Sequence, residues 1–187
     1  MLKFVSAGVW GLQAIMAIVV LALSIELTKP LPPTNGGAET EIDAPTTTKY
    51  SAFCGGFGLA VAILGIIATF FDAIPAIIVM GADAVSGILL LAGGIAFAIG
   101  LRGVDCGAST GTSPLELVNN DIINRGMILL NNKKTTYAEL WQLQANCKKA
   151  TADQAMQFVT CGFALATIAL VFLVWKKNRS GGGRAYV

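Results

Sequence analysis

Four long apolar blocks dominate this sequence and limit what the chain can fold into. As a helix, each block is long enough to cross the roughly 30 Å hydrocarbon core of a bilayer, which takes about 20 residues. Charged residues make up only 13% of the 187 residues, against about 25% in an ordinary soluble domain. The pattern predicts an all-α membrane protein, a four-helix transmembrane bundle with spans at about 4–25, 50–71, 75–101 and 154–175. A cleaved signal peptide is the alternative for the first block, although its apolar run exceeds the roughly 7–15 residues usual for one.

Composition also narrows the range of functions. The sequence contains no histidine, which excludes a histidine-based catalytic triad and a histidine-ligated metal site. Thirteen Lys and Arg against eleven Asp and Glu leave a net charge of +2, too small for a basic nucleic-acid-binding face. No motif places a nucleophile beside a base. We therefore expect a protein that is not an enzyme, has no catalytic residue, needs no cofactor or metal, and binds no nucleic acid.

The connections between the blocks set the topology. Residues 26–49 and 102–153 form two long loops on one face of the membrane, and both termini lie on the other face. Two signals for orientation disagree. The loops carry more Lys and Arg in total, which favours loops in the cytosol, whereas the basic cluster directly after the fourth block favours a cytosolic tail at 176–187. We predict extracellular loops and cytosolic termini, with a lipid-headgroup anchor formed by Trp175, Lys176, Lys177 and Arg179.

The longer loop carries two helix-start signals. Ser113-Pro114-Leu115-Glu116 and Thr136-Tyr137-Ala138-Glu139 are both capping boxes, and the first has proline at the first helical position. The first signal predicts an amphipathic helix, weakened at Gly126, that lies on the membrane surface or folds onto the second helix. The second predicts a helix that continues into the fourth span. The loop is then either a helical cap that packs on itself or a partner-binding face.

Two of the four cysteines bracket the longer loop. Cys106 and Cys147 are both expected near the outer membrane surface. A disulfide between them closes a loop of about 40 residues and stabilises the fold by about 3–4 kcal/mol in the chain-entropy model. Such a bond persists only on an oxidising side of the membrane. The alternative is two free thiols in a cytosolic loop. Cys54 and Cys161 lie inside spans, either as small buried side chains or as palmitoylation sites.

Asp83 is the one ionisable residue that the sequence places well inside a span. A carboxylate in hydrocarbon is costly, so we expect it to face other helices, with Gln13 at a similar depth as its hydrogen-bonding partner. Three interpretations are open: a tie that fixes helix packing, a contact to a lipid headgroup or protein partner, and a proton or ion path. The third gives the alternative function, a small channel or carrier that uses Asp83.

Small residues recur four positions apart in the second and third spans. This spacing lets helix backbones approach closely, either inside the bundle or between copies of the chain. The predicted helix-packing residues are Ala52, Gly56, Ala60, Gly94 and Ala98.

The layout resembles the MARVEL-domain tetraspans, with an acid in span three and a cysteine just after that span. Span three ends in Phe97-Ala98-Ile99-Gly100-Leu101-Arg102-Gly103-Val104-Asp105-Cys106, and span four follows Cys147-Lys148-Lys149-Ala150, with Gln154-Ala155 and Cys161 beyond. Both segments look like those of the fungal non-classical export protein family, which carries a similar Gly-Ile-Arg then Cys segment and a Cys-Arg-Gln-Ala start of span four. The resemblance covers all four spans at low identity, and the longer loop exceeds the family pattern.

The resemblance implies a non-enzymatic plasma-membrane protein that organises lipid and protein microdomains. Members of that family are associated with eisosomes, sphingolipid sensing and unconventional secretion. The implied partners are membrane lipids, sphingolipid or sterol among them. Assembly as a homo-oligomer or with membrane-scaffold proteins is expected as well.

Overall fold

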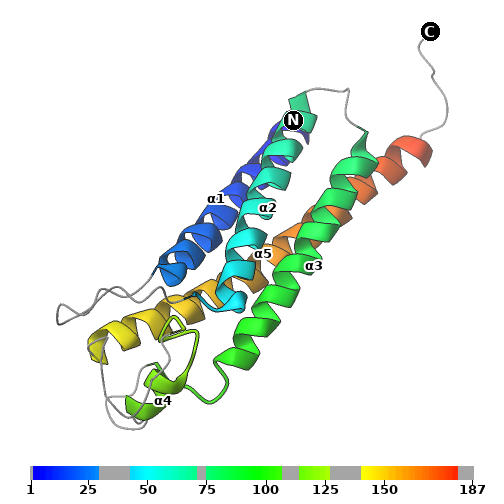
Figure 1. The fold of residues 1–187 in the computed structure, drawn as a ribbon. Helices are drawn as coiled ribbons and strands as arrows, with labels where there is room; N and C mark the ends of the chain where they lie inside the picture. The colour runs from blue at the N-terminus through cyan, green and yellow to red at the C-terminus, as the bar shows by residue number, and fades with distance from the viewer. Residues whose placement is uncertain (1, 30–42, 71–74, 107–113, 127–139, 181–187) are drawn as a thin grey trace.

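Four long helices and one short helix form the described part of the computed structural model, which comprises residues 2–29, 43–70, 75–106, 114–126 and 140–180. The helices are α1 (Leu2–Thr28), α2 (Thr46–Phe70), α3 (Ala76–Gly100), α4 (Pro114–Asn119) and α5 (Leu140–Ser180). Figure 1 shows the four long helices side by side as an elongated bundle. The prediction of an all-α, four-helix membrane bundle is therefore confirmed.

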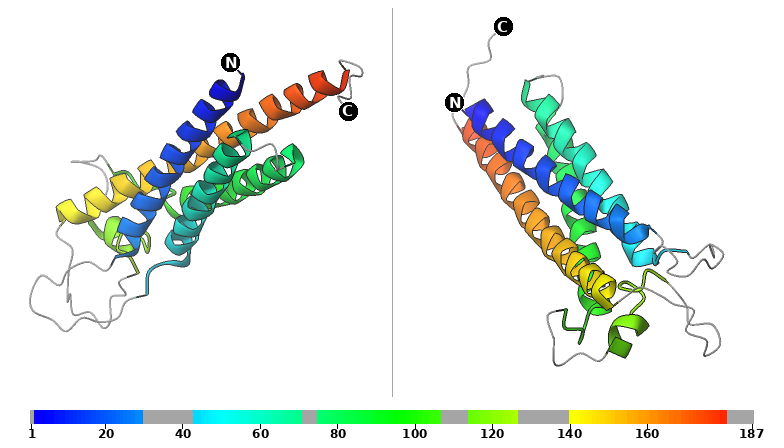
Figure 2. Two further views of the ribbon diagram at one scale, coloured as in Figure 1. Left: turned by 90° about the horizontal axis from the view of Figure 1, so that it is seen from above. Right: turned by 90° about the vertical axis from the view of Figure 1, so that its left-hand side faces the viewer.

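The four long helices are arranged as a ring. α1 packs against α2 and α5, and α3 also packs against α2 and α5. Figure 2 shows the same four helices from two further sides. α1 and α3 therefore lie diagonally across the bundle. A side chain that joins α1 to α3 must therefore pass through the centre of the bundle.

The two ends of the bundle differ. α1 and α3 end, and α2 and α5 begin, at the end that also carries α4, which we call the loop end (Figure 1). α1 begins and α5 ends at the opposite end, which we call the terminal end. The predicted separation of the long connections from the chain termini is thus present in the fold.

The outer surface of the long helices is apolar. Ile15, Ile77, Ile99 and Leu165 are each at least 60% exposed although they are large hydrophobic side chains. The segments long and apolar enough to cross a membrane are Ala7–Thr28, Thr46–Phe70, Ile77–Gly100 and Trp141–Leu173. A surface of this kind is unfavourable in water and favourable against lipid tails.

α5 is unusually long. It runs without interruption for 41 residues, from Leu140 to Ser180, which corresponds to about 60 Å of helix against roughly 30 Å of hydrocarbon. The predicted continuous helix into the fourth span is therefore confirmed, and part of α5 extends beyond the membrane. The second capping box, residues 136–139, lies outside the described residues.

The first predicted loop helix is shorter than its sequence pattern. α4 begins at Pro114, as the capping box predicts, but it ends at Asn119 after 6 residues. The side chain of Asn120 explains the end, because its Oδ1 accepts the backbone N–H groups of Ile122 and Ile123 at 3.1 and 3.3 Å. Such local bonds compete with the helical ladder. Gly126 has a φ of +81° and lies in a turn well beyond the end of α4.

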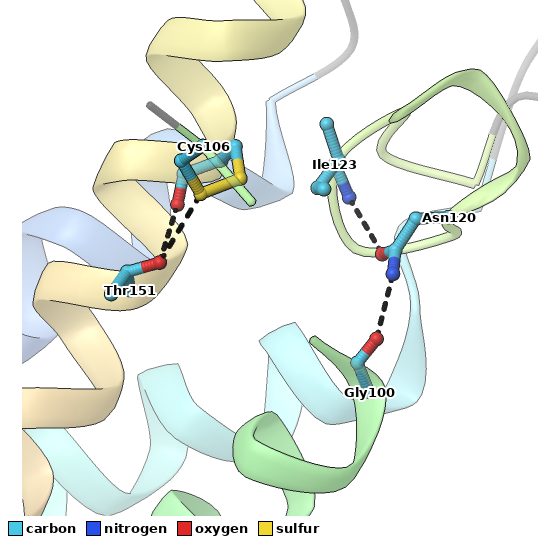
Figure 3. Close-up of a disulfide and its surroundings, with 6 residues drawn as sticks. Gly100, Cys106, Asn120, Ile123 and Thr151 are labelled. Atoms are coloured by element: carbon cyan, nitrogen blue, oxygen red, sulfur yellow. Dashed lines mark hydrogen bonds between the residues drawn. A yellow bond between two sulfur atoms is a disulfide. The ribbon is translucent and has the colours of Figure 1, made fainter. Parts of the chain in front are cut away.

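The segment that follows α4 folds onto the bundle. Leu117 and Ile123 are buried against Leu143 of α5 and Phe97 of α3, in one apolar cluster at the loop end. Asn120 Nδ2 donates to the carbonyl of Gly100 at 2.6 Å and so holds this segment to the last turn of α3 (Figure 3). Of the two predicted placements for the first loop helix, the fold has the one in which it packs on α5. We call residues 114–126 the cap.

Cys106 and Cys147 form a disulfide with a Cα–Cα distance of 5.5 Å, as predicted. Figure 3 shows the bond next to Thr151, whose Oγ1 lies 3.4 Å from Cys106 Sγ and donates to the carbonyl of Cys147 at 3.0 Å. The disulfide joins the segment just after α3 to α5. Cys54 and Cys161 are free and buried, which fits the interpretation as small core side chains.

Candidate functional site: buried polar groups in the bundle

Gln13 and Asp83 meet in the centre of the bundle. Gln13 Nε2 donates to Asp83 Oδ1 at 2.6 Å, and the two side chains are 0% and 1% exposed. Because Gln13 is on α1 and Asp83 is on α3, this hydrogen bond spans the diagonal of the four-helix ring. The contact predicted from sequence is present, and it joins α1 to α3, the two long helices that do not pack directly against each other.

The diagonal contact leaves polar atoms without partners. Gln13 Oε1, Asp83 Oδ2 and Ser86 Oγ are buried and have no hydrogen-bonding partner among the described residues. Ser86 lies one turn after Asp83 on α3 and faces Gly58 of α2, where an added Cβ would be 3.4 Å from Ser86 Oγ. The centre of the bundle therefore holds a small group of polar oxygens, surrounded by packed helices.

A second buried carboxylate lies toward the loop end, and the sequence analysis missed it. Asp153 was assigned to the 102–153 loop, but the structure places it within α5 at 0% exposure. Asp83 is therefore not the one buried acid of the long helices, because Asp153 lies within Trp141–Leu173, a segment long and apolar enough to cross a membrane. Helical spacing could have revealed this, because Cys147, Ala150, Asp153 and Gln157 follow one another at intervals of three or four and so share a helix face. All four are buried.

Asp153 is the centre of a cluster that joins three helices. Ser24 Oγ of α1 and Ser51 Oγ of α2 donate to Asp153 Oδ2 at 3.0 and 2.8 Å. Gln157 Nε2 lies 3.4 Å from the same oxygen and 2.7 Å from Ser51 Oγ, to which it donates. All four side chains are 0% exposed. We call this set of four residues the Asp153 cluster.

Charged side chains surround the loop end beyond the Asp153 cluster. Glu26, near the end of α1, pairs with Lys29 at 3.1 Å and with Lys149 of α5 at 3.3 Å. Arg125 of the cap donates from Nη1 to the carbonyl of Lys29 at 2.8 Å and from Nη2 to Asn146 Oδ1 at 2.7 Å. Burial lowers the pKa of Arg125, and the nearby charge of Glu26 opposes that shift. Arg125 thus connects the cap to both α1 and α5.

We expect Arg125→Ala to lower the free energy of unfolding by about 2–3 kcal/mol, since hydrogen bonds to charged groups contribute roughly 1.5–3 kcal/mol and Asn146 would lose a buried partner. Arg125 is 7% exposed. Chemical denaturation of the purified chain in detergent measures the change. Arg102→Ala is the matched control, because Arg102 is exposed. Equal losses for the two variants would contradict a structural role for the Arg125 contacts.

The small residues are placed differently from the prediction in α2. Ala52 and Gly56 are half-buried and Ala60 is exposed, whereas the close helix contact is at Gly55, where an added Cβ would lie 2.7 Å from the backbone nitrogen of Leu21. The predicted stripe is therefore displaced by one residue around the helix, a rotation of about 100°.

In α3 the prediction is closer to the structure. Gly94 is buried, and an added Cβ there would be 3.1 Å from the ring of Phe158 on α5. Ala98, one turn later, is half-buried. The contact at Gly94 therefore places this part of α3 against α5 within one chain.

The predicted headgroup anchor lies at the terminal end of α5. The helix continues through it to Ser180, and Lys176 is exposed. The side chains of Trp175, Lys177 and Arg179 lie outside the described residues. Within the described ranges, no three His, Cys, Asp or Glu side chains gather as a metal site would require.

Comparison with known protein families gives a match that includes most of the chain. The family model described as a membrane-associating domain matches residues 3–170, which includes all four long helices up to the last turns of α5. No curated protein and no solved structure matches the chain.

Proposed function

Because this chain belongs to the MARVEL family of membrane-associating domains, we propose that it is a non-enzymatic tetraspan of the plasma membrane that organises lipids and proteins into microdomains. The observation that carries the proposal is the distribution of polarity. Large apolar side chains are exposed on all four long helices, for example Ile15, Phe53, Ile88 and Leu165. The two carboxylates that are buried among the described residues, Asp83 and Asp153, are in contrast bound by side chains of neighbouring helices.

The polarity distribution favours lipid contact over catalysis. Lipid tails can pack against the outer faces of the helices, where many β-branched and aromatic side chains give an irregular surface. The inner polar groups hold the helices in register. A protein built in this way acts through its outer surface, by selecting the lipids and proteins that lie next to it.

The finer parts of the proposal are an eisosome-type microdomain, a link to sphingolipid or sterol, and a role in unconventional secretion. The sequence resemblance described above supports them. The Cys106–Cys147 disulfide at the loop end supports the orientation, since a disulfide persists on an oxidising side of the membrane. In the proposed orientation the loop end therefore faces the outside of the cell, and both termini face the cytosol.

The test uses the full chain, extracted in native lipid nanodiscs. Native mass spectrometry is expected to detect retained sphingolipid or sterol above the composition of the surrounding membrane, or an oligomer. Fluorescence imaging of a tagged chain is expected to show patches in the plasma membrane. A monomer without enriched lipid, together with uniform membrane fluorescence, would contradict the proposal.

A small channel or carrier is the second candidate, and the unpartnered oxygens beside Asp83 favour it. The same preparation, reconstituted into liposomes, distinguishes the two. Ion or proton flux that is lost in Asp83→Asn would replace the organiser with a transporter. Equal permeability of liposomes with and without the protein would remove the second candidate.

A further inference from the structure

The carboxylate of Asp153 has an uneven environment. Its Oδ2 atom has three polar neighbours, Ser24 Oγ, Ser51 Oγ and Gln157 Nε2, within 3.4 Å. Its Oδ1 atom is fully buried and has no hydrogen-bonding partner among the described residues. Gln157 Oε1 is buried without a partner as well. Two oxygen atoms that are strong acceptors are therefore left unsatisfied within one cluster, which is rare for buried polar groups.

The Asp153 cluster also lacks a positive charge. Within the part of the chain that the structure describes, no Lys or Arg lies at ion-pair distance from Asp153. Lys149, one turn earlier on α5, pairs with Glu26 instead, at 3.3 Å. Serine hydroxyls and a glutamine amide are neutral donors, so they solvate a carboxylate without cancelling its charge. A buried carboxylate without a counter-charge is strongly unfavourable.

We propose that the Asp153 cluster is a binding site for a small monovalent cation of the Na⁺ type. Carboxylate, hydroxyl and amide oxygens are the ligands that hard cations prefer, and the cluster supplies all three kinds from α1, α2 and α5. A half-turn of the terminal amide of Gln157 exchanges its Nε2 and Oε1 atoms and presents an oxygen to the ion. Asp153 and the ion then form a neutral pair.

The charge and position of the cluster fit this ligand. A single carboxylate balances one positive charge, whereas a divalent ion would leave a net charge in the core. Ser24 lies in the last turns of α1 and Ser51 in the first turns of α2, so the site is near the loop end. The loop end is therefore the nearer membrane face to the site. Bound there, the ion holds α1, α2 and α5 together.

The first measurement is thermal unfolding of the full chain in nanodiscs, in NaCl, KCl and choline chloride at equal ionic strength near neutral pH. Binding to the folded state raises Tm by mass action, and at ten times Kd the rise over choline is expected to be roughly 3–6 °C for a chain of this size. The Na⁺ shift is expected to exceed the K⁺ shift and to vanish in Asp153→Asn.

Thr160→Val is the matched control for that experiment. Thr160 is also buried on α5, 1% exposed, and its hydroxyl donates to the carbonyl of Met156 at 2.7 Å, outside the Asp153 cluster. This variant should keep the Na⁺ shift of the wild type. A second measurement does not depend on unfolding: the sodium NMR line should broaden with wild-type protein, and an excess of choline should leave the broadening unchanged.

Three results would overturn the proposal. Tm values that agree in all three salts, with no broadening of the sodium line, would mean that only water occupies the site. A Na⁺ shift that persists in Asp153→Asn would place the ion elsewhere. A Tm that follows pH but not Na⁺ would show that a proton neutralises Asp153.

Discussion

Replacing Gly55 with leucine is expected to separate α1 from α2 and to lower the free energy of unfolding by more than the roughly 1–3 kcal/mol usual for an overpacked core. The reason is geometric. A Cβ at this position would lie 2.7 Å from the backbone nitrogen of Leu21 and 2.9 Å from its Cα. Backbone atoms cannot turn aside as a side chain can, so the whole of α1 must move. Denaturation of the purified chain in detergent and its elution volume in size-exclusion chromatography measure the effect.

Gly56→Leu is the matched control for this prediction. It adds the same side chain one residue later in the same helix, but the nearest atom to an added Cβ is Leu21 Cδ1 at 4.0 Å. That atom is the end of a flexible side chain, so the loss should be small. Similar losses at both positions would show that any added bulk in α2 is harmful, and the close contact between α1 and α2 would not be the cause.

Removing the Cys106–Cys147 disulfide is expected to have a comparably large effect. The bond closes a loop with a sequence separation of 41 residues, for which the chain-entropy model gives about 4 kcal/mol. The free energy of unfolding of the double variant Cys106→Ser, Cys147→Ser should be lower by that amount, so the variant should unfold at a lower denaturant concentration. Reductant should have the same effect on the wild type. Thiol labelling of the denatured, unreduced wild type should modify only Cys54 and Cys161.

Cys161→Ala provides the control for the disulfide. It removes a buried thiol that takes no part in the bond, so the variant should still lose stability on reduction. If reductant leaves the stability of the wild type unchanged, then the bond does not hold α3 to α5, and the apolar cluster at the loop end is sufficient. Either result is read from the same denaturation curve.

Much of the fold follows directly from the sequence. A long apolar run has one stable conformation in a bilayer, because every backbone polar group must be satisfied within the segment. The four spans and their hairpin order could therefore be predicted. The disulfide could be predicted as well, because Cys106 and Cys147 lie near the same membrane surface. The Gln13–Asp83 hydrogen bond could be predicted because the two polar side chains lie at a similar depth in the membrane and both need a polar partner there.

The rest of the site depends on how each helix is rotated about its own axis and on where each helix begins and ends. A hydropathy pattern gives neither of these. Asp153 was assigned to a loop because an apolar window ends beside a charged residue, although α5 begins 13 residues earlier, at Leu140. Nothing in the sequence distinguishes Arg125 from the other cations of the 102–153 loop, because its contacts to Lys29 and Asn146 depend on the path of a cap whose helix stops early. The predicted small-residue stripe in α2 is wrong for a related reason. Gly55 and Gly56 are the same residue type, and only the rotation of α2 about its axis decides which of them faces α1.

The length of α5 has a mechanical consequence. The cap is bonded to α5 through Arg125 and Asn146, and the segment after α3 is bonded to it through Cys147. From these attachment points the same helix continues to Ser180 at the opposite end of the bundle. The cap and the exposed Lys176 are therefore attached to one continuous helix. A tilt of α5 as a rigid body would displace the cap at one membrane face and this lysine at the other.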